Sequence, residues 1–508
     1  MTTPRSAPSW SCRSLLIAAP FAVVLAASPL MAADLRIGLQ EDPDILDPHE
    51  ARTFVGRIVF NALCDKLVDT DAKLQFVPRI ATSWTVADEG KTLAFKLRPG
   101  VTFHDGTPLD ATAVKANLER AMTAKTSRRK SELKSVAAVE TPDATTVVLK
   151  LKQKDSTLLA QLSDRAGMLL SPKSFDKPVG PNPVCSGPYS FVERVQNDRI
   201  VLKKFAGHWD AANQHFDRIV FRIIPDTTVR LANLRSGQLD MLERLAPTDV
   251  KSAKADAALK VVSIAGLGYQ GITINLNNTA RSEGPLGKDR RVRQALSLSL
   301  DRKAINDVVF EGLNTPSIQP FPPASPFHEQ AVGVPARDVA KAKALLKAAG
   351  HEKVTFEMQV ANSTVEQQLA QVIQAMAAEA GFDIKIKATE FASMLKQQSA
   401  GNYQATRVGW SGRVDPDGNI HQFVTTGGGI NDTKYTNADV DRELNAARTV
   451  YDIAKRKAHY AAAMKILRDD LPIMYLYHPS WIWALSSKVD GFVANPDGMI
   501  RLSGMKLK

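Results

Sequence analysis

The chain has 508 residues, of which 44% are hydrophobic and 23% are charged, as is usual for a globular protein. A chain of this length is expected to form two or three lobes, not one hydrophobic core. Its formal charge of +12 is spread along the sequence, and no basic patch alternates with aromatic residues, which argues against nucleic-acid binding. The one dense basic run, residues 125–134 (KTSRRKSELK), is interpreted as a solvated helix face or loop.

Residues 1–33 have the pattern of a secretory signal peptide. Arg5 and Arg13 precede a short apolar run at residues 14–27, and small residues follow at Ala32 and Ala33. The apolar run is too short to span a bilayer comfortably, and no later segment is long and apolar enough to do so. The mature protein is therefore expected to be soluble and periplasmic.

The cysteines are consistent with export. Cys12 precedes the apolar run, so it cannot be the lipidated first residue of a mature lipoprotein. The remaining pair, Cys64 and Cys185, favours one disulfide in an oxidising compartment, with two unrelated buried thiols as the alternative. Neither has a nearby Cys or His partner, so the spacing does not indicate zinc.

Strand and helix patterns alternate along the chain. In chain order, the expected elements are a strand at 35–40, an alternating segment at 91–103 with a Pro-Gly turn, a helix at 110–122 capped by Asp110, strands at 145–152 and 199–205, a helix at 289–302 capped by Asp289, a helix at 338–350 closed by Gly350, a strand at 354–360, a helix at 365–381, a strand at 382–389, two helices within 439–470, and a strand region at 471–485. The strand–helix–strand order at 354–389 predicts a mixed or parallel sheet covered by helices.

The segment 407–423 (RVGWSGRVDPDGNIHQF) contains the residues most suggestive of chemistry. Its GWSGR is not a nucleophile elbow, because Arg413 occupies the second glycine position. DPDGN matches the first three ligand positions of a calcium loop, but Ile420 stands where the loop needs glycine and Thr426 where it needs glutamate.

Elsewhere, HDG at residues 104–106 is better explained as a turn than as a catalytic group. The histidines show no paired zinc spacing, and there is no phosphate loop or dinucleotide fingerprint. The sequence therefore predicts neither an enzyme nor a resident metal or cofactor.

Several blocks, in this order, resemble the family 5 extracellular solute-binding proteins, which are the dipeptide- and oligopeptide-binding components of ABC importers. The most specific is 97–120 (LRPGVTFHDGTPLDATAVKANLER), and SGPYSF at 186–191, LRSGQLD at 234–240 and GW…DPDGN at 409–419 follow it. The resemblance extends over essentially the whole mature chain.

The resemblance implies an α/β periplasmic binding protein with two lobes, a hinge, and an extra domain inserted in the first lobe. The implied boundaries are 34–78, 186–270 and 478–508 for lobe I, 79–185 for the inserted domain, and 271–477 for lobe II. It also places Cys64 and Cys185 in or beside the same discontinuous lobe, which favours their pairing.

The resemblance also implies a ligand site between the lobes. In peptide-binding members, a tryptophan at the position of Trp410 packs on the ligand, and an acid three residues later pairs with the peptide amine. Here that acid is replaced by Arg413, which points to an anionic ligand group, while an internal pair with Asp415 or Asp417 is the alternative. The other candidate ligand-binding residues, for each of which a structural role is an equal alternative, are Thr53, Phe54, Tyr269, Gln270 and Asn431.

The function implied by the resemblance is capture of a small peptide or peptide-like, carboxylate-bearing solute by a monomer, and its delivery to a membrane permease that works with an ATPase. Two alternatives stay open. One is a sensor component that presents ligand to a chemoreceptor or kinase, and the other is an exported hydrolase. The identity of the solute, whether a peptide, an opine or another carboxylated compound, is not encoded in any recognisable motif.

Overall fold

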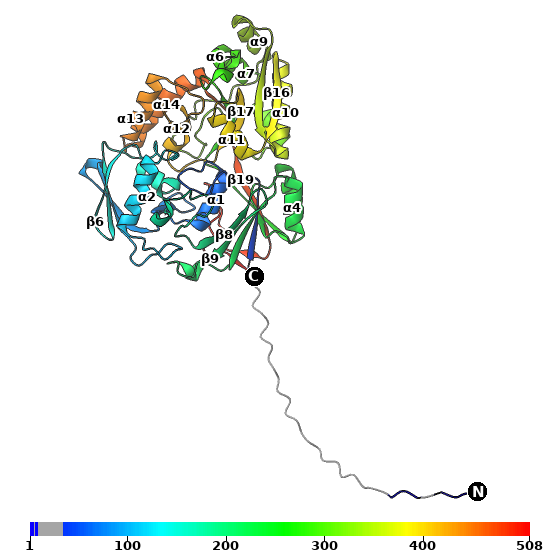
Figure 1. Cartoon of the computed structure of the whole chain (residues 1–508). Helices are drawn as coiled ribbons and strands as arrows, with labels where there is room; N and C mark the ends of the chain where they lie inside the picture. The colour runs from blue at the N-terminus through cyan, green and yellow to red at the C-terminus, as the bar shows by residue number, and fades with distance from the viewer. Residues whose placement is uncertain (5, 9–33) are drawn as a thin grey trace. The chain divides into compact units, whose positions relative to one another are not determined.

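The computed structural model describes residues 1–4, 6–8 and 34–508. The predicted signal peptide therefore lies mostly outside the described residues. Within 34–508, two large sheets form the centres of two lobes, and a smaller sheet lies beside the first of them (Figure 1). None of the described helices combines the length and the apolar character that crossing a membrane requires.

Lobe I is built on a seven-stranded mixed sheet. In spatial order its strands are β12 (Leu259–Ala265), β19 (Ser480–Ser486), β11 (Met241–Leu242), β1 (Asp34–Leu39), β10 (Arg218–Ile223), β9 (Arg199–Lys204) and β8 (Tyr189–Val195). β1 runs parallel to β10 and β11, whereas β12 and β19 are antiparallel. The helices of this lobe are α1 (Phe54–Leu63), α4 (Thr227–Arg235) and α5 (Val250–Lys254). Leu35, Ile37 and Leu39 alternate along β1 and are fully buried, as a half-buried strand requires.

The segment between β1 and β8 contributes a separate antiparallel sheet with its own hydrophobic core. Its strands, in spatial order, are β4 (Ala81–Ala87), β5 (Thr92–Leu97), β7 (Thr146–Leu151) and β6 (Val136–Asp143), with α2 (Ala111–Thr123) and α3 (Leu158–Leu162) beside them. The predicted cap of α2 is confirmed, because the Asp110 side chain accepts a hydrogen bond from the Ala113 amide. The predicted turn at residues 104–106 is also confirmed, with Gly106 at a φ of +77°.

Lobe II is built on a six-stranded mixed sheet. In spatial order its strands are β14 (Thr315–Pro316), β18 (Ile473–His478), β13 (Tyr269–Ile274), β17 (Ala405–Trp410), β15 (Val354–Ala361) and β16 (Phe382–Thr389). The predicted strand–helix–strand unit is confirmed, because β15 and β16 are parallel and joined by a helix. The helices of this lobe are α6 (Pro285–Lys288), α7 (Arg290–Leu298), α8 (Arg302–Phe310), α9 (Val339–Ala348), α10 (Thr364–Ala378), α11 (Phe391–Ser399), α12 (His421–Val424), α13 (Ala438–Arg448) and α14 (Ile453–Asp470).

One helix expected from the sequence is divided in the structure. The pattern at residues 289–302 predicts a single helix, but α7 ends at Leu298. The Asp301 side chain then accepts a hydrogen bond from the Ala304 amide and caps a new helix, α8. A capping aspartate can end one helical run and start the next even where the apolar spacing continues.

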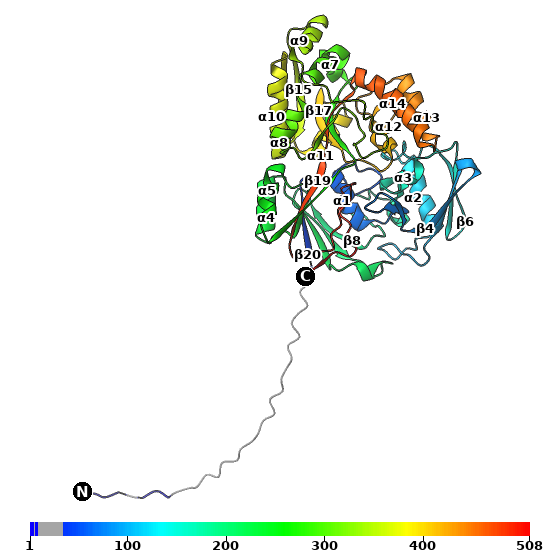
Figure 2. The ribbon, with the colours of Figure 1, turned by 180° about the vertical axis from the view of Figure 1, so that it is seen from behind.

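The chain passes between the lobes at two adjacent places; Figure 2 shows the two lobes from the opposite side. Residues 266–268 join β12 to β13, and Pro479 joins β18 to β19. The Gly266 amide donates to the Pro479 carbonyl at 2.9 Å, so the two connections lie side by side. At Gly268, a Cβ atom would lie 1.8 Å from the carbonyl oxygen of Trp410, which leaves room only for glycine. This close approach fixes Trp410 next to the connection between the lobes.

Cys64, which follows α1, and Cys185 are joined by a disulfide with a Cα–Cα distance of 4.8 Å. Replacing both cysteines by alanine is expected to lower the free energy of unfolding by about 2–4 kcal/mol, because the crosslink closes a long loop and restricts the unfolded chain. Their sequence separation is 121 residues. Denaturant unfolding of the mature protein measures the change. Thiol titration of the unreduced, denatured mature protein should find no free thiol, and two free thiols would contradict the pairing.

Candidate functional site

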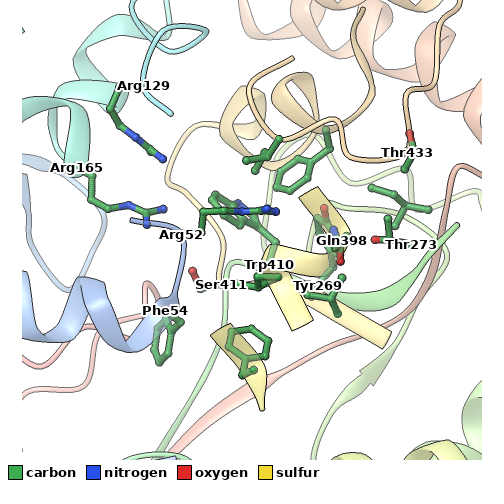
Figure 3. Close-up of a pocket in the computed structure, with 17 residues that line it drawn as sticks. Arg52, Phe54, Arg129, Arg165, Tyr269, Thr273, Gln398, Trp410, Ser411 and Thr433 are labelled. Atoms are coloured by element: carbon green, nitrogen blue, oxygen red, sulfur yellow. The ribbon is translucent and has the colours of Figure 1, made fainter. Parts of the chain in front are cut away.

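Two adjoining cavities lie where lobe I meets lobe II. We call the first the arginine cavity; it is lined by Arg52, Arg129, Arg165, Tyr269 and Trp410 among others (Figure 3). We call the second the mixed-charge cavity; it is lined by Glu41, Arg244, Gln270, Glu366, Arg407 and Tyr477 among others. The two cavities share the wall residues Phe54, Phe391, Val408, Gly409 and Ser411. One elongated solute could therefore contact both.

Trp410, at the end of β17, forms one wall of the arginine cavity and is 8% exposed. Two side chains fix its ring. The Arg413 guanidinium lies over it at 4.1 Å from the centroid, and Phe423 meets it edge-on at 4.9 Å. Its indole Nε1 is buried without a hydrogen-bond partner among the described residues. A rigid aromatic wall with a free donor is suited to holding a solute that has both apolar and polar parts.

Arg413 does not line either cavity. Its Nε lies 2.9 Å from Asp164 Oδ2, and the guanidinium is held between that carboxylate and the Trp410 ring. It borders instead a separate cavity of about 550 Å³. Because Asp164 comes from the segment between β1 and β8, the Arg413–Asp164 pair joins the two lobes.

The alternative pairing of Arg413 with Asp415 or Asp417 is wrong. Asp415 is paired with Arg456 at 2.7 Å, and Asp417 with Arg448 at 2.7 Å. Arg448 lies at the end of α13 and Arg456 lies in α14. The carboxylates of Asp415 and Asp417 therefore point toward these two helices. Local spacing suggested the pairing, but the folded loop directs Arg413 away from both acids.

Asp164 is shared by three arginines. Besides Arg413, it pairs with Arg57 Nη2 at 2.6 Å and Arg165 Nε at 3.7 Å. Burial would raise the pKa of Asp164, but Arg413, Arg57 and Arg165 outweigh burial and hold the pKa well below its usual value. One carboxylate cannot neutralise three guanidinium groups, so this cluster carries excess buried positive charge.

Arg165 is the most deeply buried of these arginines. It is 0% exposed, and its Nη1 donates to the Ala51 carbonyl at 2.5 Å. Its Nε and Nη2 have no hydrogen-bond partner in the described part of the chain. Burial, and the nearby charge of Arg129, lower its pKa to about 9, so it remains charged at neutral pH. A buried guanidinium with free donors is costly unless an anion reaches it.

Arg129 and Arg52 complete the cationic side of the arginine cavity. Arg129 is 2% exposed, pairs with Glu132 at 2.5 Å, and has no partner for its Nε among the described residues. Figure 3 shows Arg129 and Arg165 extending from the same side toward Trp410. Arg52 pairs with Asp432 of lobe II at 2.7 Å. The cavity therefore suits a carboxylate, which accepts parallel hydrogen bonds from a guanidinium fork.

The mixed-charge cavity combines acids and bases from both lobes. Glu41 Oε1 lies 3.0 Å from Arg244 Nη2, and Arg407 Nη2 lies 3.2 Å from Glu366 Oε1. Arg407 also donates to Gln270 Oε1 and to the Tyr477 hydroxyl, each at 2.8 Å. This network places the candidate Gln270 at the cavity wall through Arg407.

The other sequence candidates divide into cavity residues and structural residues. Phe54 lines both cavities and stacks on Trp481 at 4.4 Å, and Tyr269 lines the arginine cavity. Thr53 instead caps α1 by accepting from the Gly56 amide and donates to Asp44. Asn431 lines neither cavity: its Nδ2 donates to the carbonyls of Thr425 and Tyr435 and so holds its loop together.

The buried arginines that make the site cationic could not be identified from the sequence. The interpretation of residues 125–134 as solvated is wrong for Arg129, which packs inward and pairs with Glu132. Arg165 lies in an unremarkable SDRAG segment. The only sequence signal was the density of arginines near acids, and that signal does not say which of them become buried. Among the described residues, no cluster of His, Cys, Asp and Glu could hold a metal ion.

Comparisons with known proteins agree with this architecture. The model of the bacterial extracellular solute-binding proteins, family 5, matches residues 75–431. The glutathione-binding protein GsiB of Pectobacterium atrosepticum is 28% identical over 502 residues, covering 96% of each chain. The structure of AgaA from A. tumefaciens in complex with agropinic acid superposes with a TM-score of 0.85 at 25% identity, covering 94% of this chain and 99% of that one.

DppA from Helicobacter pylori, solved with a peptide, has the same fold, with a TM-score of 0.87 at 24% identity over 94% of this chain and 98% of that one. The names and titles of these relatives describe binding proteins and not enzymes. The family match spans most of the chain, including the segment from the small sheet to Trp410. The chain thus belongs to the bacterial extracellular solute-binding proteins of family 5.

Proposed function

We propose that this protein is the periplasmic solute-binding component of an ABC importer, and that it captures a small, carboxylate-bearing solute between its lobes without chemical change. The observation that carries the solute class is Arg165, which is fully buried beside the cavity and whose Nη2 has no hydrogen-bond partner among the described residues. The relatives support it, because glutathione and agropinic acid are both carboxylic acids.

The size of the site favours a small solute. The arginine cavity has a volume of about 70 Å³ and the mixed-charge cavity about 150 Å³. Pockets for drug-sized ligands usually span about 300–1,000 Å³. A peptide of many residues would need the lobes to stand further apart, whereas a compact acid fits with the lobes close together.

Export and delivery form the second part of the proposal. We propose that a signal peptide is removed so that the mature protein begins at Ala33 or Asp34, carries no lipid and acts as a monomer. The closed, solute-loaded form docks on a membrane permease, whose partner ATPase supplies the energy. N-terminal sequencing of the exported protein tests the start site.

The two adjacent connections between the lobes support a hinge that lets the lobes close on the solute. We propose lobe I as 34–78, 186–268 and 479–508, with 79–185 inserted, and lobe II as 269–478. These limits move the boundaries that the resemblance implies, 270/271 and 477/478, to 268/269 and 478/479, because β13 and β18 belong whole to the lobe II sheet. A solute that contacts both lobes stabilises the closed state by its higher affinity for that state. Small-angle scattering should therefore show a smaller radius of gyration with solute, and an unchanged radius with binding verified would contradict hinged closure.

Mass spectrometry of the solute released by mild denaturation tests the proposed function. The expected result is a low-mass compound with at least one carboxylic acid, absent from a matched preparation of the Arg165→Gln variant. Release of only uncharged or cationic compounds would contradict the proposal. Incubation of the released compound with fresh protein should return it unchanged, because binding without chemistry is proposed.

A further inference from the structure

The cavity that Arg413 borders, which we call the hinge cavity, has no role in the proposed capture of the solute. Its volume is about 550 Å³, compared with about 70 Å³ and 150 Å³ for the two solute cavities. Gly266 and Leu267 of one connection between the lobes and Pro479 of the other line it. Among the described residues, it shares none with the arginine cavity and only Pro479 and Ser480 with the mixed-charge cavity. The hinge cavity is therefore a separate space.

The wall of the hinge cavity is mostly apolar. Leu74 and Phe76 line it from the segment between β1 and β8, Ile264 lines it from β12, and lobe II contributes residues 322–327 (PPASPF). Its volume lies within the range of about 300–1,000 Å³ that is usual for small-molecule pockets. A water molecule in a cavity needs about two to four polar partners, which an apolar wall does not supply. The cavity therefore suits a small molecule with an apolar body.

His478, at the end of β18, contributes a free hydrogen-bond acceptor to this wall. It is 3% exposed, and its Nδ1 lies 2.7 Å from the Gly268 carbonyl oxygen. Burial lowers the pKa of His478 to about 4, so the ring is neutral at pH 7. Because a carbonyl only accepts, the single ring proton lies on Nδ1, and Nε2 keeps its lone pair. Nε2 has no hydrogen-bond partner among the described residues. A ligand that donates a hydrogen bond would supply that partner.

Arg413 contributes a free hydrogen-bond donor to the same wall. It is 7% exposed, its Nε is paired with Asp164, and its Nη1 donates to the Gly412 carbonyl at 2.8 Å. Its Nη2 has no partner in the described part of the chain. The other charged side chain that lines the cavity, Asp415, is paired with Arg456 at 2.7 Å. Both charges face an opposite charge, so the ligand needs polarity here but no charge of its own.

We propose that the hinge cavity is a second binding site, and that its ligand is an uncharged phenolic compound. A phenolic hydroxyl donates one hydrogen bond and accepts another, so it matches the free acceptor of His478 and the free donor of Arg413. The aromatic ring and its apolar substituents pack against the apolar wall. A phenol ionises near pH 10, so the compound is neutral at pH 7. This site goes beyond the proposed function and is tested separately from it, because the ligand lies outside both solute cavities.

Isothermal titration calorimetry of the mature protein with thymol and with thymol methyl ether tests the site. The ether keeps the ring and the alkyl groups but cannot donate a hydrogen bond. Thymol should bind at one site per chain, and the ether should bind about three- to tenfold more weakly. His478→Phe should weaken thymol binding by the same factor and leave binding of the ether unchanged, because phenylalanine keeps an aromatic ring and removes the acceptor.

A second variant fills the cavity without touching its polar groups. Ala160, in α3, is 8% exposed and lines the hinge cavity. In Ala160→Leu the larger side chain occupies part of the space that the ligand needs. This variant should therefore weaken binding of thymol and of the ether alike, by about tenfold or more.

The matched control is His421→Phe. His421 is also a lobe II histidine that is 3% exposed, but it lines none of the three cavities. This variant should bind both probes as the unmodified protein does. The hinge site would be overturned if thymol showed no saturable binding below about 1 mM, if the ether bound as tightly as thymol, or if Ala160→Leu bound thymol normally. The result for Ala160→Leu decides the matter even where His478→Phe fails to fold.

Discussion

Replacing Arg165 by glutamine is expected to weaken binding of the carboxylate-bearing solute by about 2–5 kcal/mol, as for truncating one partner of a buried charge pair. Glutamine keeps part of the side-chain length but cannot carry charge. In the ligand-free protein the same change should not lower the free energy of unfolding, because it removes one of several buried cations that share the Asp164 carboxylate. Calorimetric titration and denaturant unfolding give the two quantities separately.

Arg218→Gln is the matched control for this prediction. Arg218 also pairs with an aspartate, Asp34, at 2.8 Å, but its side chain is 53% exposed and lies on the lobe I sheet away from both cavities. This variant should bind the solute normally. If Arg165→Gln bound as tightly as the control, or if it simply failed to fold, the assignment of Arg165 to the solute carboxylate would be contradicted.

Asp164→Asn should mainly lower the free energy of unfolding, whereas Arg165→Gln should mainly weaken binding of the solute. The carboxylate faces three buried arginines, and removing it leaves them repelling one another. Breaking a buried pair in this way costs about 3–5 kcal/mol. Denaturant unfolding of the ligand-free protein measures it. Asp198→Asn, which removes a carboxylate from the exposed pair with Arg199, is the control and should change stability by less than about 1 kcal/mol.

The difference in the free energy of unfolding between the unmodified protein and Asp164→Asn should depend on pH in one direction only. The pKa of Asp164 is held well below its usual value in the folded protein, so its contribution is fully present above the unfolded pKa of about 3.9. It is lost as the pH falls through the folded pKa. The gap in stability between the unmodified protein and Asp164→Asn should therefore persist at neutral pH and narrow only in strong acid. A gap of less than about 0.5 kcal/mol at pH 7 would contradict the shared-carboxylate arrangement.

Local features of this fold could be predicted because short-range physics decides them. Asp110 and Asp289 each cap a helix at the position that the sequence predicts, since a cap needs only an amide two or three residues away. The strand–helix–strand unit at 354–389 could be predicted from the strand and helix spacing of its apolar residues, which does not depend on distant parts of the chain. The exception, the division of the helix at Leu298, also has a local cause in a second capping aspartate.

The site could be predicted only in part, because its charges meet through the fold. The sequence indicated Trp410, Tyr269, Gln270 and Phe54, all of which line the cavities, through the family resemblance and not through their own pattern. It could not show that Arg413 meets Asp164. That pair depends on how the small sheet sits against lobe II, which no spacing along the chain encodes.

The unpaired donors of the buried arginines could not be predicted from the sequence for the same reason. Whether Arg165 or any other arginine keeps free donors depends on which carbonyls and carboxylates the folded chain brings within reach. A sequence shows how many charges there are and which are neighbours along the chain. It does not show that one aspartate must serve several guanidinium groups, and that imbalance is what indicates an anionic solute.

The most direct test of the account compares the released solute with its methyl ester in the unmodified protein and in two variants. The ester should bind the unmodified protein about 2–5 kcal/mol more weakly than the acid, because the charged oxygen pair that Arg165 meets is gone. That difference should disappear in Arg165→Gln and persist in Arg413→Gln, whose side chain holds Trp410 and Asp164 but lines neither cavity. An ester that binds the unmodified protein as tightly as the acid would contradict the account.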